Sequence, residues 1–290
     1  MSDTTPFFEN VQTIYDDDHS DDLLALFLDD EMVYSCAYFE RDDMSLGEAQ
    51  IAKLDLSLGK CDLSPGQTLL DIGCGYGACA YRAAAKYGVN VIGLTLSEKQ
   101  ARHCREKMKG LPPEAGKVEI RLAGWEEFDQ PVDRIVSIGA FEHFRRERFA
   151  QFFETAHRLL PADGRMMLHT IVAFDFPRLD SLGIEVTHEN VLFGKFIQRK
   201  VFPGGQLFDP RVIEDFATKA GFRIERAQSL QLHYARTLET WAANLERRHD
   251  EAVAIKGEQG YAFFMKYLTG CAAHFRSGHI DVVQFTMVPR

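Results

Sequence analysis

The sequence lacks long apolar segments and an excess of basic charge. No stretch of about 18 consecutive apolar residues occurs, which argues against a membrane-spanning helix. Lys and Arg number 33 against 43 Asp and Glu, for a formal net charge of −10. Nucleic acid is therefore not expected as a partner, because a phosphate-binding surface needs a basic excess. The acidic N-terminal residues MSDTTPFFENVQTIYDDDHSDD predict neither a signal peptide nor a transit peptide.

Cysteines are few and scattered, and no two of them form a CxxC pair. Their spacing does not indicate a disulfide framework, and without a CxxC knuckle we expect no metal site. The sequence therefore predicts a protein of a reducing compartment, the cytoplasm. The six cysteines are Cys36, Cys61, Cys74, Cys79, Cys104 and Cys271.

From residue 67 onward, short apolar runs alternate with helical stretches of roughly 10 to 15 residues. Helices alternating with buried strands predict an α/β fold with a parallel, doubly wound sheet. The expected strands are 68–72, 89–94, 118–122, 132–138 and 165–172, followed by a sixth at 221–227.

The flanking segments complete one domain of four parts. Residues 1–60 are expected to form a helical cap, with two short acidic helices before residue 30 and a helix at 46–60. Residues 67–172 form the binding core. Residues 173–220 are irregular, aromatic and too long for a simple connection, which predicts a lid or substrate insertion. Residues 221–290 would complete the sheet with helices at 237–255 and 259–275 and a last strand, 281–288, at an edge.

A glycine-rich turn, DIGCGYG at 71–77, stands where the first strand ends and a helix begins. Glycines there allow a sharp turn and the close approach of a ligand. Gly73, Gly75 and Ala78 also satisfy the dinucleotide pattern GxGxxA. That pattern needs an acidic residue about 20 positions further on, and residues 93–97 read GLTLS. A nicotinamide cofactor is therefore disfavoured, and a turn without any ligand remains the plain alternative.

Several stretches carry a resemblance to a known family. They include YSCAYFERDDMSLGEAQ (34–50), LLDIGCGYG (69–77), NVIGLTLSEKQ (90–100), FPGGQL (202–207) and HYARTLETWAANLE (233–246), and matches of this kind cover nearly the whole chain. The sequence resembles the mycolic acid cyclopropane synthases, relatives of bacterial cyclopropane fatty-acid synthases. The resemblance implies the class I methyltransferase fold, a Rossmann-like sheet of seven strands with the last inserted antiparallel, and S-adenosylmethionine as cofactor.

The resemblance also assigns residues to this cofactor. Tyr34 and Ser35 would contact its methionine end, and Trp125 and Glu126 would frame the adenine. Trp125 as plain core and Glu126 as a solvated loop charge are the alternatives. Tyr76 departs from the tryptophan common in the family, and we expect little change from it. The implied cofactor residues are Tyr34, Ser35, Asp71, Gly73, Gly75, Thr95, Leu96, Gln100, Trp125 and Glu126, of which Thr95, Leu96 and Gln100 would hold the ribose.

By the same resemblance, a bicarbonate ion would act as a base in making a cyclopropane from a double bond. Glu142 beside an anion must be protonated or paired through His169, because two bare anions repel. Each residue has a plainer alternative: Cys36 as a small buried hydrophobe, His169 as a satisfied core residue and Glu142 as a helix cap. The implied bicarbonate ligands are Cys36, Glu142, His169, Tyr234 and the backbone near Ile138.

Methylation of a double bond leaves a carbocation, so its site should be apolar, with aromatic faces that stabilise the cation. The family's acyl chain, long and unsaturated, is thought to arrive on an acidic acyl carrier protein, with peripheral membrane association also conceivable. A basic patch at Arg145, Arg146 and Arg148, or at Lys195, Arg199 and Lys200, would suit that carrier, although solvated helix charges are as good an explanation. The candidate acyl tunnel comprises Tyr34, Phe39, Phe141, Phe144, Leu192, Phe196, Phe202, Leu207 and Tyr234.

Three alternatives to cyclopropanation stay open at this point. A close relative would stop short of ring closure and give a hydroxy-methyl or methyl-branched product. The stretch GAFEHF (139–144) favours the cyclopropane members, because their relatives often change it. A lipid-binding protein that has lost catalysis and a nicotinamide oxidoreductase are the more distant alternatives.

Overall fold

The computed structural model describes residues 20–290, so the first of the two expected acidic helices lies outside the described residues. The second begins as helix α2 (Ser20–Leu24). The apolar side chains at the end of this helix and just after it are buried, as expected, with Leu23 and Phe27 almost fully enclosed. Both side chains belong to an apolar cluster that also contains residues of the two C-terminal helices, so the cap packs on the far end of the chain.

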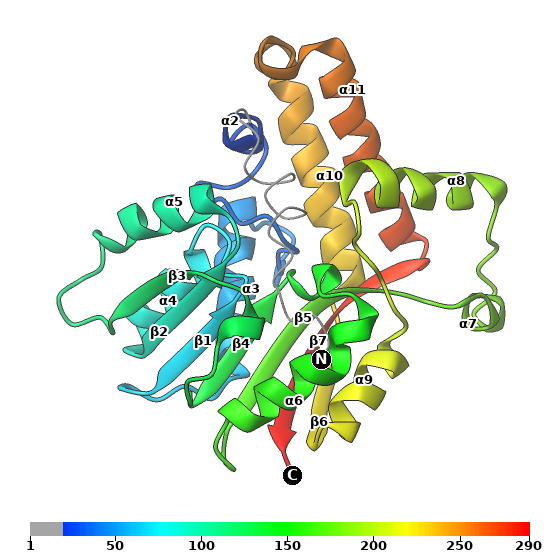
Figure 1. Cartoon of the computed structure of the whole chain (residues 1–290). Helices are drawn as coiled ribbons and strands as arrows, with labels where there is room; N and C mark the ends of the chain where they lie inside the picture. The colour runs from blue at the N-terminus through cyan, green and yellow to red at the C-terminus, as the bar shows by residue number, and fades with distance from the viewer. Residues whose placement is uncertain (1–19) are drawn as a thin grey trace.

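Seven strands form one sheet in the order β3-β2-β1-β4-β5-β7-β6 (Figure 1). The five strands that the apolar runs predicted are all present, and their neighbours pair in parallel. The doubly wound α/β fold is therefore confirmed. The strands are β1 (Thr68–Ile72), β2 (Asn90–Thr95), β3 (Val118–Leu122), β4 (Arg134–Ile138), β5 (Arg165–Ala173), β6 (Phe222–Ser229) and β7 (Ile280–Pro289).

The position of β7 corrects one expectation. Strand β7 does not lie at an edge but between β5 and β6, antiparallel to both, as the family resemblance implied. Seven of its ten residues are buried, which suits a strand enclosed on both sides. The edge is occupied instead by β6, whose residues are mostly exposed. The register places Gln284 of β7 opposite His169 of β5.

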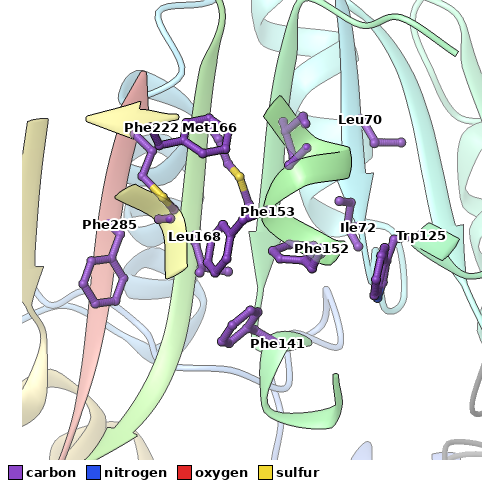
Figure 2. Close-up of a cluster of buried hydrophobic side chains, with 14 of the residues drawn as sticks. Leu70, Ile72, Trp125, Phe141, Phe152, Phe153, Met166, Leu168, Phe222 and Phe285 are labelled. Atoms are coloured by element: carbon purple, nitrogen blue, oxygen red, sulfur yellow. The ribbon is translucent and has the colours of Figure 1, made fainter. Parts of the chain in front are cut away.

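Helices cover both faces of the sheet (Figure 1). On one face, α6 (Phe149–Leu159) and α9 (Pro210–Lys219) enclose Leu70 and Ile72 of β1 with Trp125 at one end of the cluster (Figure 2). On the other face, α3 (Leu46–Gly59) and α4 (Ala78–Tyr87) enclose Leu69. Leu69 and Leu70 belong to apolar clusters on opposite faces of the sheet, because successive side chains of a strand point to opposite faces. Helix α5 (Glu98–Met108) packs beside β2 and β3.

Residues 174–209 are not irregular, as the sequence suggested. They contain α7 (Phe176–Ser181), α8 (His188–Phe196) and a π-helical turn (Ile197–Val201). Capping side chains that start α7 and α8, Asp175 and Thr187, explain these helices locally. Helix α9, which follows, packs against α6 and β6 as a regular member of the helical layer.

A pair of long helices, α10 (Gln231–Arg247) and α11 (His249–Arg276), projects beyond the sheet (Figure 1). The sequence predicted one break, near 256–258, and the helix is indeed interrupted at Gly257, with φ of 70° and ψ of 170°. The further turn at Arg248, between α10 and α11, was not expected. Helix α8 lies against α11, where Phe193 stacks on His274 with ring centroids 4.6 Å apart.

Candidate active site

All ten residues assigned to the cofactor line a single cavity. They come from the carboxyl ends of β1 and β2, from the loop after β3, from the first turn of α5 and from residues 34–35. The carboxyl ends of parallel strands are where open α/β sheets bind their ligands. The fold therefore brings together every residue of this set.

The end of β2 orients the side chains expected at the ribose. The Ser97 hydroxyl caps α5 by accepting a hydrogen bond from the backbone N–H of Gln100, with N and Oγ 3.1 Å apart. The Thr95 hydroxyl donates to Gln100 Oε1 at 2.8 Å. Because this bond occupies the side-chain oxygen of Gln100, the side-chain nitrogen remains as a donor for a ligand in the cavity that Gln100 lines.

The glycine-rich turn leaves room for a ligand at one position and is tightly packed at another. A Cβ atom added to Gly73 would lie 2.4 Å from Ala140 Cβ, so this glycine is required by packing. A Cβ atom added to Gly75 would meet nothing within 4 Å, although Gly75 lines the cavity. Both glycines have positive φ, 78° and 53°, a region that favours glycine. The turn therefore forms a cradle at Gly75.

Tyr76, the departure from the family pattern, also lines this cavity. Its ring is buried and packs edge-on to His103, with centroids 5.2 Å apart. Its hydroxyl donates to Asp21 of α2 at 2.5 Å. The aromatic character of the position is kept, and the hydroxyl ties the turn to the N-terminal helix.

Trp125 is both core and cavity wall. It belongs to the large apolar cluster (Figure 2), where its ring packs edge-on to Phe152 at 5.2 Å. It also lines the cofactor cavity, and its buried indole N–H has no hydrogen-bond partner among residues 20–290. The two readings of Trp125 are therefore compatible.

Glu126 is not a solvated charge. Its side chain is buried and forms an ion pair with Arg148, Nη1 to Oε1 2.9 Å. Burial raises the pKa of Glu126, and Arg148 opposes that shift. One carboxylate oxygen is thus already engaged by protein. The pair also means that Arg148 is buried, so only Arg145 and Arg146 of the expected patch reach the surface.

A second cavity, of about 480 Å³, lies against the first, and its volume falls in the range of small-molecule sites. Its lining is largely apolar and comes from β5, α8, α10, α11 and residues 202–208. Four of the five implied bicarbonate ligands, Cys36, Glu142, His169 and Tyr234, line this cavity, whereas Ile138 lines the cofactor cavity. Ile138 nevertheless pairs with His169 in the sheet register.

Gln284 determines how His169 faces the cavity. The Gln284 amide nitrogen lies 3.1 Å from His169 Nδ1 and 3.0 Å from the Ser57 hydroxyl. As Gln284 donates to Nδ1, the imidazole proton is placed on Nε2. Burial lowers the pKa of His169 well below its usual value, with Lys53 and Lys60 adding to the effect. His169 is therefore a neutral hydrogen-bond donor.

Glu142 is buried and only half satisfied. Its Oε1 accepts the Ile171 amide at 2.7 Å, while Oε2 has no partner within the described part of the chain. Burial raises the pKa of Glu142. Because Glu142 bonds to Ile171 and His169 bonds to Gln284, the structure shows no pairing of Glu142 through His169. A protonated Glu142, the other alternative, agrees with the direction of the pKa shift.

Cys36 and Tyr234 are neutral under ordinary conditions. Cys36 is completely buried, and its thiol donates to the Ala37 carbonyl at 3.1 Å. Burial raises the pKa values of both side chains. A thiol in this state is not an activated nucleophile, so the structure does not indicate covalent chemistry at Cys36.

Residues 33–37, here called the dividing segment, separate the two cavities. Tyr34 and Ser35 line both, as do Gly139 and His143 opposite them. The Gln50 side chain donates to the carbonyls of Val33 and Ser35 at 3.3 and 2.8 Å. A reaction between a group in one cavity and a group in the other must therefore take place beside this segment.

Several polar residues of this arrangement escaped the sequence analysis: Gln50, Lys53, Thr237 and Gln284. Gln50, Lys53 and Ser57 recur at helical spacing on the buried side of α3. A polar stripe on the core-facing side of a helix was the available signal. For Gln284 the sequence contained no such signal, because only the pairing of β7 with β5 brings this residue to His169.

The expected acyl tunnel is only partly correct. Tyr34, Phe202, Leu207 and Tyr234 line the second cavity, whereas Phe144 lines the cofactor cavity. The remaining members do not line either cavity: Phe39 and Phe141 are core residues, Phe196 packs against the apolar cluster of α10 and α11, and Leu192 is on the surface. The lining that the sequence missed comes mainly from α8, α10 and α11 and includes Phe193, Ile197, Leu238, Tyr267, Cys271 and Phe275.

Unpartnered buried polar atoms in the two cavities fit the two groups that the family resemblance implied, S-adenosylmethionine and bicarbonate. Asp71 Oδ2 and the Trp125 indole N–H are buried in the first cavity without partners in the described chain, and Gly75 leaves open space. In the second cavity, Glu142 Oε2 is the unpartnered atom. Such orphaned buried groups are rare in proteins unless a ligand, ion or water satisfies them. Within residues 20–290 no helix is apolar and long enough to span a membrane, and no group of three metal-ligating side chains occurs.

Comparison with known proteins identifies the family. The family model described as mycolic acid cyclopropane synthetase matches residues 2–285. The chain belongs to this family. It is 56% identical over 283 residues to cyclopropane mycolic acid synthase 3 of Mycobacterium tuberculosis, covering 98% of each chain. It is 52% identical to the S-adenosylmethionine-dependent methyltransferase UmaA of the same organism, covering 99% of each.

A solved structure agrees with this membership. Mycolic acid cyclopropane synthase CmaA1 complexed with SAH and CTAB superposes with a TM-score of 0.93 at 53% identity, covering 98% of this chain and 99% of that one. This member of the mycolic acid cyclopropane synthetase family is an S-adenosylmethionine-dependent methyltransferase of the class I fold.

The cradle at Gly75 yields a test of the cofactor cavity. We predict that Gly75→Val abolishes binding of S-adenosylmethionine and S-adenosylhomocysteine, because the side chain would fill the open space beside the turn. Valine at a positive φ also costs roughly 1–2 kcal/mol of stability. Gly183→Val is the matched control, since Gly183 has φ of 69° and open space around it but lies outside the cavity. Calorimetry on both folded variants measures the affinities, and unchanged affinity in Gly75→Val would contradict the cradle.

Proposed function

We propose that this enzyme transfers a methylene bridge from S-adenosylmethionine to a cis double bond of a long-chain, mycolic-type acyl group, giving a cyclopropane. The observation that carries the proposal is the meeting of the cofactor cavity, which is lined by the buried groups of Lys53 and Asp71, with a largely apolar cavity along the dividing segment. The relative CmaA1 was solved with both SAH and CTAB, a long-chain molecule, which supports a lipid-like occupant for the apolar cavity.

The cofactor, when bound, supplies an electrophilic methyl group, and the residues of the acyl cavity determine what can react with it. A carbon–carbon double bond is a weak nucleophile, so stronger nucleophiles must be absent from the site. The raised pKa of the Cys36 thiol meets this requirement. The rings of Tyr34, Tyr234 and Tyr267 line the cavity and stabilise a developing carbocation through their π faces.

Ring closure requires that a proton leave the newly added methyl group. Bicarbonate, when bound, supplies the base for that step. We infer that Cys36, Glu142, His169 and Tyr234 hold it, with the backbone near Ile138. Support comes from the unpartnered Glu142 Oε2 and from the His169 proton on Nε2, which together offer hydrogen bonds to an anion. A neutral Glu142 donates to the anion instead of repelling it.

A carrier for the acyl group belongs to the same proposal. Lys195, Arg199 and Lys200 are exposed on α8 and the π-helical turn, while Phe193 and Ile197 of the same segment line the acyl cavity. This basic segment at the cavity wall suits an acidic acyl carrier protein, because charge complementarity steers association. The burial of Arg148 favours this segment over the alternative patch, which keeps only Arg145 and Arg146 at the surface.

A cytoplasmic, reducing location is also proposed. All six cysteines are free thiols, and five of them are buried. Buried thiols without disulfides are typical of proteins in reducing compartments.

Glu142 separates methyl transfer from ring closure. We predict that Glu142→Ala keeps cofactor affinity but slows cyclopropane formation by about 10²–10⁴-fold, the range for a lost general base, because the bicarbonate loses a group that holds it. Glu142→Gln should lose much less, because its amide can donate to the anion as a neutral carboxyl does. Products should shift toward hydroxy-methyl or methyl-branched chains. Mass spectrometry of the acyl products measures this shift, and His169→Ala and Tyr234→Phe should show weaker versions.

The Gln variant is the control for structural damage. It can still accept the Ile171 amide, whereas Glu142→Ala leaves that buried N–H unpaired at a cost of about 1–3 kcal/mol. Cyclopropane production at the wild-type rate by a folded Glu142→Ala enzyme would remove Glu142 from the proposed mechanism.

The carrier proposal predicts a loss of association rate. Reversing Lys195, Arg199 and Lys200 to Glu should slow capture of a carrier-bound acyl chain, mostly through the association rate and most strongly at low salt. Reversing three other exposed basic residues, Lys219, Arg223 and Arg226 near the β6 edge, is the matched control. Stopped-flow measurement of association decides. Equal slowing by both triple variants would mean that net charge alone, and no docking segment, governs capture.

A further inference from the structure

Lys53 is a buried ammonium group that the proposed chemistry does not use. Its side chain, on α3, is 1% exposed. Its Nζ donates to the Ser35 hydroxyl at 2.8 Å, and no carboxylate of the described chain lies within ion-pair distance. Lysines are almost never fully buried unless paired, because removing an ammonium from water without a counter-charge is costly. A negative partner is therefore missing from its surroundings.

Lys53 lines the cofactor cavity together with Asp71. Asp71 is an acidic group in a similar situation. The Asp71 carboxylate is buried, and its Oδ2 atom has no partner in the described residues. The two groups interact electrostatically but form no ion pair with each other. One cavity thus holds an unpaired buried cation and a half-satisfied buried carboxyl group.

We propose that Lys53 binds the α-carboxylate of the cofactor's methionine end, with Asp71 accepting from its α-ammonium group. An α-amino acid carries one charge of each sign on a single carbon, so it complements two separated, opposite, buried charges. The Ser35 hydroxyl accepts a hydrogen bond from Lys53 and therefore lies at the same end of the cavity. The inference rests on the S-adenosylmethionine assignment and not on the chemistry at the double bond.

The titration of this pair gives the proposal a pH signature. Burial lowers the pKa of Lys53 to about 8 and raises the pKa of Asp71 to about 7. The other titratable groups that face Lys53 are Cys36, Cys79, Asp29 and His169. Burial holds both thiols protonated and His169 neutral, and it raises the pKa of Asp29.

The expected profile therefore has two limbs. As pH rises through about 8, free Lys53 loses its proton and with it the charge that pairs with a carboxylate, so affinity falls. As pH drops through about 7, Asp71 gains a proton and loses its attraction for an ammonium group, so affinity falls again. Affinity for S-adenosylhomocysteine should be highest between these values.

The test compares two ligands on two proteins by calorimetry. The ligands are S-adenosylhomocysteine and its decarboxylated analogue, which keeps the amine. Lys53→Met should weaken binding of S-adenosylhomocysteine by roughly 30-fold or more, as for loss of one partner of a buried charge pair, and should remove the alkaline limb. Binding of the decarboxylated analogue should not weaken, and the acid limb should remain.

Lys60→Met is the matched control. Lys60, just after α3, is also partly buried with its pKa lowered to about 8, but it bonds to Gln284 and does not line the cofactor cavity. Its loss should leave S-adenosylhomocysteine affinity unchanged. If Lys53→Met weakens both ligands equally, or neither, Lys53 is only a support for Ser35 and the proposal is wrong.

Two further outcomes are informative. If Lys53→Met does not fold, the wild-type protein decides: an alkaline limb near pH 8 for S-adenosylhomocysteine that the decarboxylated analogue lacks supports the proposal, and identical limbs overturn it. If the wild-type protein binds neither ligand at any pH, the cofactor assignment itself fails.

Discussion

The dividing segment, residues 33–37, is held from two sides, and both cavities depend on that attachment. From α3, Gln50 binds the Val33 and Ser35 carbonyls. From α10, the Thr237 hydroxyl accepts the Ala37 amide at 3.0 Å. Buried backbone groups left without partners would cost free energy, so these bonds fix the path of the segment. That path determines which residues of the segment face the cofactor cavity and which face the acyl cavity.

The segment also separates two electrostatic environments. On the cofactor side, burial lowers the pKa of Lys53 to about 8 and raises the pKa of Asp71 to about 7. The two groups therefore carry opposite charges between these values, which suits a zwitterionic ligand. On the acyl side, Glu142 and His169 are driven toward their neutral forms by burial. A neutral, largely apolar cavity allows a weakly nucleophilic double bond to approach an electrophile without competition from water or charged groups. The positions of the helices therefore set the chemistry that each cavity supports.

Local sequence patterns predicted the elements that depend on near neighbours. The apolar runs located β1 to β5, and the turn at 71–77 located the cofactor cavity. Contacts between distant segments were not readable in the same way. The place of β7 between β5 and β6, and with it the bond from Gln284 to His169, depends on pairing across more than 100 residues. The burial of Arg148 depends on Glu126, which is distant in sequence. The sequence analysis had placed Arg148 at the surface only because it stands in a cluster of basic residues.

Deuterium counting tests the central claim, that a proton leaves the added methyl group to close the ring. The purified enzyme would be given a carrier-bound cis-unsaturated acyl chain and S-adenosylmethionine labelled with a CD₃ methyl group. Mass spectrometry of the product then counts the deuterium atoms retained. The account predicts a cyclopropane that keeps two of the three, because one leaves with the base. A product that keeps all three, as a hydroxy-methyl or methyl-branched chain would, contradicts it.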